Sequence, residues 1–159
     1  MSELSKHQEQ FKRLGRWYER FKNINDGQIH DKPSDCYQDE VIAFFMNCHH
    51  LKDWIINDPT AVSVANKVEA YINNNTELSL CAYICNSLKH LRLLKKQRSK
   101  EKPEFGPRKY EIDLGTEPKT IAVKYTINTL SGPRDAFDIA TKCMEAWGKF
   151  YSDNNLKRD

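Results

Sequence analysis

The apolar residues of this chain recur at intervals of three and four positions, which places them along one side of an α-helix. In residues 4–23 the stripe consists of Phe11, Leu14, Trp17, Tyr18 and Phe21. A second stripe follows Asp35, which has Gln38 three positions later in the manner of a capping box. This stripe predicts the main core helix, and it consists of Val41, Phe44, Phe45, Cys48, Leu51, Trp54 and Ile55.

Three more helices are predicted further along the chain. Asp58 can cap the first of them, with Pro59 at the initial position, where the missing N–H costs nothing. Its expected buried face consists of Val62, Ala65, Val68, Tyr71 and Ile72. Thr76 can cap a fourth helix, whose apolar stripe continues into a lysine-rich stretch and ends near Ser99. The closing helix is expected over residues 135–151.

Alternating apolar residues predict a β-hairpin over residues 108–129. The alternating positions are Tyr110, Ile112 and Leu114, then Ile121, Val123, Tyr125 and Ile127. An isolated two-stranded ribbon is marginal in water, so the hairpin should lie against the helices or against a partner's hairpin. We therefore predict a mainly α protein, a bundle of about five helices with a β-hairpin before the last helix and a loose tail over residues 152–159.

Length and composition fit one folded domain spanning residues 1–159. Hydrophobic residues make up 39% of the 159 and aromatic residues 11%, which is too apolar for a disordered chain. The uncharged, mainly apolar run over residues 41–48 has eight residues, against the roughly 20 that a membrane span requires. The first residues have no signal-peptide pattern, and the five cysteines include no CxxC pair. These features predict a cytoplasmic protein that does not enter a membrane.

Charge is distributed unevenly along the chain. Residues 89–102 contain seven basic residues and one acid, residues 6–22 contain six and two, and residues 26–80 contain three and nine. If the two basic segments lie together, they form one surface for a polyanion such as RNA. The alternative is that they are simply solvated helix faces. The residues expected to contact RNA are Arg92, Lys95, Lys96 and Arg98.

Two patches concentrate reactive side chains, and both are predicted to be helical. In the first patch, His49 and His50 lie four and three positions before Asp53, so one imidazole can share the carboxylate's face. Such a pair is either a tuned base or a structural hydrogen bond that fixes the imidazole tautomer. The candidate catalytic residues from this patch are His50 and Asp53.

The second patch places Asn86, Lys89 and His90 at positions i, i+3 and i+4 of the fourth helix. An amide, an ammonium and an imidazole that point the same way can bind a phosphate and move a proton without a metal. The alternative is a polar helix edge that happens to carry a histidine.

Other kinds of site are less well supported. A mixed zinc site from Cys81, Cys85 and His90 with Cys48 and its two histidines is conceivable, but free cysteines are commonly small buried hydrophobes. A cysteine nucleophile beside a histidine is also conceivable. The chain has no glycine-rich phosphate loop and no GxSxG motif, which excludes P-loop hydrolysis and α/β-hydrolase chemistry. We expect no metal and no cofactor.

The second patch resembles the signature of the HEPN superfamily, compact helical bundles found among toxins, antiphage defence proteins and RNA-processing enzymes. That signature is an Arg, often followed by a polar residue such as Asn, with a His four to six positions later on a late helix. Asn86 matches the polar position and His90 the histidine, but the Arg position holds Cys85. The resemblance spans residues 35–150.

The resemblance implies a homodimer in which the fourth helices face each other across a shared cleft. Active members are similar to metal-independent ribonucleases, in which the RNA 2′-hydroxyl attacks the adjacent phosphate. His90 would then be the general acid or base, Lys89 would hold the phosphate and Asn86 would orient an oxygen.

Because Cys85 replaces the Arg, the favoured function is an RNA- or partner-binding module with a degenerate site, in a phage-defence or toxin–antitoxin setting. Its protein partner would be an antitoxin or a larger effector. The alternative is an active endoribonuclease that uses His90.

Overall fold

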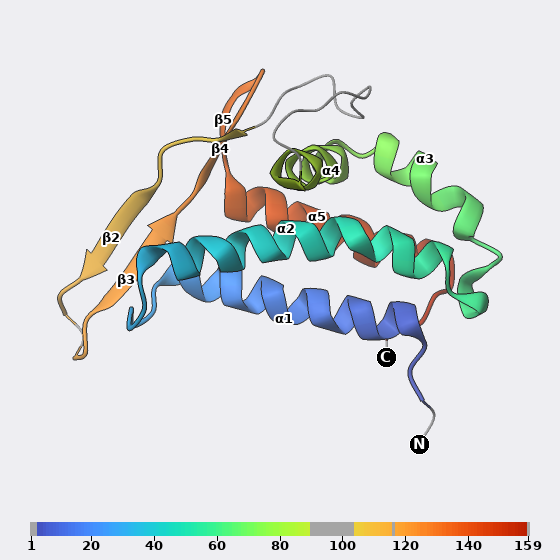
Figure 1. Cartoon of the computed structure of the whole chain (residues 1–159), viewed down its shortest axis with the longest axis horizontal. Helices are drawn as coiled ribbons and strands as arrows, with labels where there is room; N and C mark the ends of the chain where they lie inside the picture. The colour runs from blue at the N-terminus through green and yellow to red at the C-terminus, as the bar shows by residue number, and fades with distance from the viewer. Residues whose placement is uncertain (1–2, 90–103, 116, 159) are drawn as a thin grey trace.

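The computed structural model describes residues 3–89, 104–115 and 117–158. Within these ranges the chain is mainly helical, as predicted, with five α-helices and a small antiparallel β region before the last helix (Figure 1). The helices are α1 (Lys6–Asp26), α2 (Ser34–Ile56), α3 (Val68–Asn73), α4 (Thr76–Lys89) and α5 (Ala136–Asp153).

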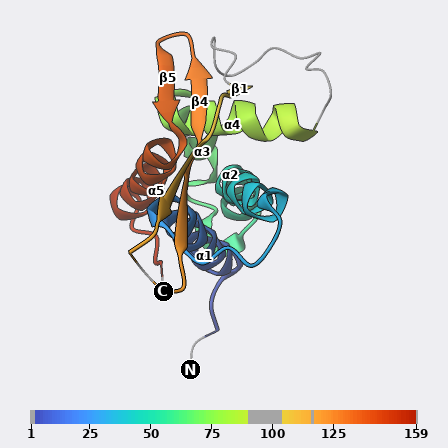
Figure 2. The same ribbon diagram turned by 90° about the vertical axis from the view of Figure 1, so that its left-hand side faces the viewer.

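Three long helices form the body of the bundle, and α4 lies across them. Figure 1 shows α1 and α2 lengthwise and α4 end on, whereas Figure 2 shows α4 lengthwise above the ends of α1, α2 and α5. α4 contacts both α2 and α5. Consequently α2 lies between α1 and α4, and side chains of α2 can meet α4 on one side and α1 on the other.

The first helix begins with a capping box that its amphipathic stripe alone does not reveal. Ser5 is the N-cap, and its backbone N–H donates to Oε1 of Gln8 at 2.7 Å. This hydrogen bond satisfies a backbone donor that has no partner inside the helix. The helix ends at Gly27, whose φ of 118° favours glycine.

The prediction of a continuous third helix from residue 58 was wrong. Two short 3₁₀ turns, η1 (Pro59–Ala61) and η2 (Ala65–Lys67), precede α3. Asp58 does cap the first turn, because its side chain accepts the Thr60 N–H. Because the two short 3₁₀ turns replace a continuous α-helix, Val62 is 74% exposed although its spacing predicted burial, and Val64 is buried instead.

The β region is more complex than one hairpin over residues 108–129. β2 (Lys109–Asp113) pairs with β3 (Thr120–Lys124), and β1 (Glu104–Phe105), β4 (Thr126–Thr129) and β5 (Gly132–Asp135) form a separate sheet in the order β1-β4-β5. The predicted second strand is divided at Tyr125, whose carbonyl accepts the N–H of Ala136 at 2.9 Å. β3 lies against the end of α1 through two backbone hydrogen bonds between Ile121 and Gln28. The expectation that the hairpin lies against the helices is thus confirmed.

Aromatic side chains fill the centre of the bundle. The ring of Phe21 on α1 lies 5.9 Å and 6.0 Å from those of Phe44 and Phe45 on α2, and 5.3 Å from that of Phe137 on α5. The indole N–H of Trp147 on α5 donates to the Cys48 carbonyl at 3.1 Å. Edge-on aromatic packing and the removal of apolar surface from water both stabilise this contact of three helices.

The end of the chain packs onto the bundle in place of the loose tail expected over residues 152–159. α5 continues to Asp153, and Leu156 packs against the core. The guanidinium of Arg158 donates to the Gly148 carbonyl at 2.9 Å and lies 5.9 Å from the centre of the Phe11 ring. Apolar contact and hydrogen bonding therefore hold this segment as far as residue 158.

None of the described helices combines the length and the apolar character needed to cross a lipid bilayer.

Candidate functional site

The patch on α2 meets the beginning of the patch on α4. Nε2 of His50 lies 3.7 Å from Sγ of Cys85, a contact between residues 35 positions apart in the chain. It follows from the crossing of α4 over α2, which brings the middle of one helix against the last described turns of the other (Figures 1 and 2). Sequence spacing predicts each patch separately but contains no signal that they touch.

The predicted His–Asp pair on α2 does not form. His50 and Asp53 are both exposed, and no hydrogen bond or ion pair joins them among the described residues. The hydrogen bond that Asp53 does accept goes to its backbone carbonyl, from the side-chain amide of Asn57 at 2.8 Å near the end of the helix. His49, the neighbouring imidazole, is buried. His50 is therefore the accessible histidine of this patch, and it faces α4 rather than Asp53.

The α4 patch is described only in part. Asn86 is half-buried, and Lys89 is the last helical residue of α4. His90 and the expected RNA contacts Arg92, Lys95, Lys96 and Arg98 lie outside the described residues. The grouping of Asn86, Lys89 and His90 on one face thus remains a prediction.

Cys85, which the resemblance aligns with the arginine of the HEPN signature, is buried where α4 meets α2. Its exposed fraction is 2%. A side chain at this position points toward His50 rather than into solvent, and a thiol carries no positive charge for a phosphate. This position therefore provides no electrostatic stabilisation of an anion.

The two basic segments of the sequence begin on different sides of the bundle. The residues of segment 6–22 belong to α1, whereas segment 89–102 begins at the end of α4, and α2 lies between these two helices (Figures 1 and 2). Residues 90–102 lie outside the described residues, so the single basic surface formed by the two segments remains a prediction.

The basic face of α1 carries two arginine–tryptophan pairs. The Arg13 guanidinium lies 5.5 Å from the centre of the Trp54 ring, and that of Arg20 lies 4.6 Å from the Trp17 ring. Both tryptophans are half-buried. One part of each ring therefore packs in the protein and another part is accessible to solvent. The guanidinium over each ring is attracted to its π-system.

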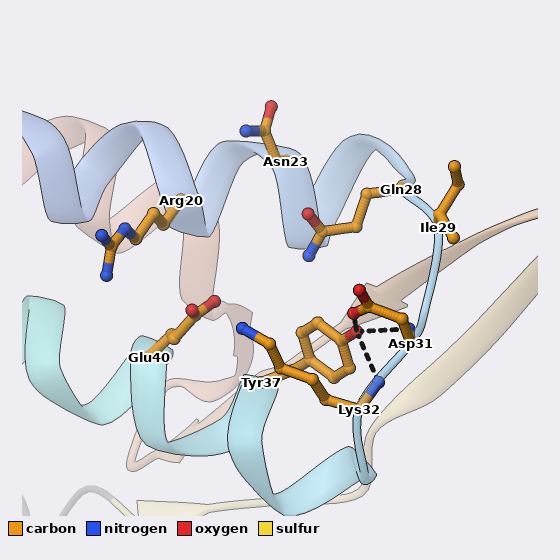
Figure 3. Close-up of a pocket in the computed structure, with 8 residues that line it drawn as sticks. All are labelled: Arg20, Asn23, Gln28, Ile29, Asp31, Lys32, Tyr37 and Glu40. Atoms are coloured by element: carbon orange, nitrogen blue, oxygen red, sulfur yellow. Dashed lines mark hydrogen bonds between the residues drawn. The ribbon is translucent and has the colours of Figure 1, made fainter.

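A polar hollow of about 280 Å³ lies where α1 ends and α2 begins (Figure 3). The Tyr37 hydroxyl organises its wall, because it accepts backbone N–H groups of Asp31 at 3.0 Å and Lys32 at 3.3 Å. The lining residues are Arg20, Asn23, Gln28, Ile29, Asp31, Lys32, Tyr37 and Glu40. Because their charges have both signs, the hollow shows no preference for an anion over a cation.

Three cysteines from three helices converge in the core. The Sγ atoms of Cys48 on α2, Cys81 on α4 and Cys143 on α5 all lie within 4.8 Å of one another, and all three side chains are fully buried. Sγ of Cys81 donates to the Phe45 carbonyl at 3.2 Å, and Sγ of Cys143 donates to the Glu77 carbonyl at 3.4 Å. Burial raises the pKa of both thiols well above the ordinary value. We call Cys48, Cys81 and Cys143 the tricysteine cluster.

The tricysteine cluster differs from the mixed zinc site considered from the sequence. That site required Cys85 and histidines, whereas the cluster contains only sulfur and includes Cys143 from the closing helix. The sequence placed Cys48 on the apolar stripe of its helix, and such a pattern predicts burial but not which thiols meet.

Comparisons with known proteins identify no relative. No family model matches the chain, and neither a curated protein nor a solved structure matches it.

Proposed function

We propose that this protein is a HEPN-like, cytoplasmic RNA-binding module with a degenerate site, which binds RNA as a homodimer without cleaving it. The observation that carries the proposal is the burial of Cys85 against His50, with 2% of its side chain exposed and 3.7 Å between sulfur and nitrogen. The HEPN position that meets the phosphate with a guanidinium thus holds a neutral group turned into the bundle.

Affinity for RNA is supported by the basic residues that follow this position. Segment 89–102 has seven basic residues against one acid. Lysine and arginine side chains that replace counterions at phosphates provide an attraction that needs no catalytic group. A module of this kind suits a phage-defence or toxin–antitoxin setting, where an antitoxin or a larger effector would be its protein partner.

The arginine–tryptophan pairs on α1 support a contact with unpaired bases. Single-stranded RNA binds through basic grooves combined with aromatic rings on which bases stack. Trp54 and Trp17 each have one arginine within 5.5 Å of the ring centre. A base could replace the guanidinium on the ring while the arginine turns to a phosphate.

An electrophoretic mobility shift with single-stranded RNA at several salt concentrations tests this function. Replacing Lys95, Lys96 and Arg98 with Gln should weaken binding at least tenfold and reduce the slope of log affinity against log salt by about 2, given roughly 0.7 per phosphate contact. The matched control replaces Lys109, Lys142 and Lys149, which are exposed on other elements, with Gln. Equal losses in both triple variants, or no binding by the wild-type protein, would refute the proposal.

One observation favours the alternative, an active metal-independent endoribonuclease. The exposed imidazole of His50 lies beside α4 at Cys85, five positions before His90, so a second histidine is available next to the same helix. Incubation with transfer RNA in EDTA separates the two functions. Cleavage by the wild-type protein that disappears in His90→Ala would establish the enzyme, and intact RNA with both proteins would support the binding module. Sedimentation equilibrium tests the homodimer.

A further inference from the structure

The tricysteine cluster is the one group of three or more metal-ligating side chains that lie close together among the described residues. It joins three helices that are remote in sequence, since Cys48, Cys81 and Cys143 lie on α2, α4 and α5. None of the three has any exposed surface. The donor atoms are all sulfur.

The spacing of the sulfurs is near that of a metal site. Thiolates bind at about 2.3 Å, so three of them around a trigonal ion lie about 4.0 Å from one another. In the protein all three sulfurs are already within 4.8 Å of one another. Small rotations about the side-chain bonds would bring them to bonding distance, and the helix backbones could stay in place.

The donor set selects for a soft ion. Thiolate ligands favour ions such as Cu(I), whereas Mg²⁺ and Ca²⁺ require oxygen ligands. Zinc in structural sites almost always has four ligands, and the cluster supplies three in a place closed to water. An ion that accepts three sulfur ligands therefore fits better than one that requires a fourth.

Bound metal would replace thiol protons that are now held by the protein. Without an ion, the S–H groups of Cys81 and Cys143 donate to the carbonyls of Phe45 and Glu77. Each sulfur that becomes a thiolate ligand releases its proton to solvent. The single positive charge of Cu(I) compensates the charge of one such thiolate, so burial favours the form of the site with the fewest thiolates. Since the cluster is closed in the folded state, the ion would enter as the chain folds.

We propose that Cys48, Cys81 and Cys143 form a three-coordinate binding site for a soft, thiophilic metal ion of the Cu(I) type, which ties α2, α4 and α5 together. The site is independent of the proposed RNA-binding function. Its consequence is a fold whose stability depends on metal supply.

Anaerobic refolding of the full chain with Cu(I), and separately with Zn²⁺, tests the site. The readouts are native mass spectrometry, which counts ions and displaced protons, and ultraviolet sulfur-to-metal charge-transfer absorption. We expect one Cu(I) per chain and at least 100-fold weaker retention in Cys48→Ser and in Cys143→Ser. The matched control Cys85→Ser, which replaces a buried thiol of α4 outside the cluster, should retain the ion as the wild-type protein does.

The wild-type measurements keep the proposal testable even if a serine variant fails to fold. Thermal unfolding of the wild-type protein should shift to higher temperature with Cu(I), and the shift should grow from pH 6 to pH 8, because fewer protons then compete for sulfur. No retained Cu(I), equal retention in the serine variants, or retention of Zn²⁺ alone would overturn the proposal.

Discussion

Asp58 is a buried carboxylate that connects two distant parts of the chain. One oxygen accepts the His7 N–H at 2.9 Å, and the other accepts the N–H and the hydroxyl of Thr60 at 2.9 Å and 2.8 Å. Burial opposes its ionisation, but the hydrogen bonds from His7 and Thr60 outweigh burial and lower its pKa. A charged group with 3% exposure is thus stabilised by donors on both sides.

The substitution Asp58→Asn should reduce the free energy of unfolding by about 2 kcal/mol, because the amide nitrogen places a donor where one acceptor oxygen is needed. Urea denaturation measures the change. The matched control is Asp53→Asn on the exposed surface of α2, which should change stability by less than about 0.5 kcal/mol. A similar loss in both variants would contradict the role assigned to Asp58.

The spacing of apolar residues along one helix predicts well which of its side chains are buried. It correctly placed Leu14, Phe21 and Phe44 in the core. It could not predict the contact of His50 with Cys85 or the meeting of Cys143 with Cys48, because these depend on how helices cross. Spacing also cannot test the predicted roles of Lys89 and His90, because those roles depend on which groups from other elements surround the two side chains.

At the scale of elements, specific side-chain contacts fix the transition from β5 to α5. The Asp135 side chain accepts the N–H of Asp138 at 3.2 Å and so caps α5. The preceding residue, Arg134, places its guanidinium 3.2 Å from Glu77 on α4. The start of the closing helix is therefore fixed to the sheet on one side and to α4 on the other.

Removing the cap with Asp135→Ala should cost about 1 kcal/mol, because the N–H groups of the first turn lose a protein acceptor. Asp135→Asn keeps a side-chain oxygen and should cost less than half as much. Thermal denaturation followed by circular dichroism compares the two variants. If Asn and Ala were equally destabilising, the charge of Asp135, rather than its capping hydrogen bond, would be its main contribution.

The elements that sequence predicted least well are short ones. Residues 58–67 have helical spacing but form 3₁₀ turns, because the Asp58 side chain closes a local turn with Thr60 and the chain then turns Val62 outward. Likewise the alternation of apolar and polar residues predicted one strand through Tyr125. The carbonyl of Tyr125 instead accepts a hydrogen bond from the first residue of α5, Ala136. Long amphipathic helices are more predictable, because many residues contribute to the same pattern.

For the whole molecule, the start of α1 and the end of α5 are joined by buried polar groups. Nδ1 of His7 lies 2.9 Å from the Tyr151 hydroxyl, and both side chains are buried. Burial lowers the pKa of His7, although the charge of Asp58 acts in the opposite direction. The folded protein therefore favours the neutral imidazole.

This arrangement predicts a loss of stability in mild acid. A histidine whose pKa is lowered on folding contributes fully above its unfolded pKa of about 6.5, and the contribution disappears as the pH falls toward the folded value. Asp58, whose pKa is also lowered, adds a second loss below about pH 4. Urea unfolding at pH 8, 7, 6 and 5 measures the first loss.

The control for the pH experiment is the exposed histidine of α2. His50→Gln should retain the wild-type decline between pH 7 and pH 5, whereas His7→Gln should flatten it. A decline that His7→Gln leaves unchanged would assign the acid sensitivity to other groups.

The contact between His7 and Tyr151 also holds the beginning of α1 close to the end of α5. Both ends of the described chain lie at the same end of the bundle (Figures 1 and 2). A short glycine-rich linker could join them, and new ends could be opened at Leu130, which is 78% exposed between two short strands. In such a circular permutant α5 would come before α1 and α2 in the chain, and the three helices would pack around the same core.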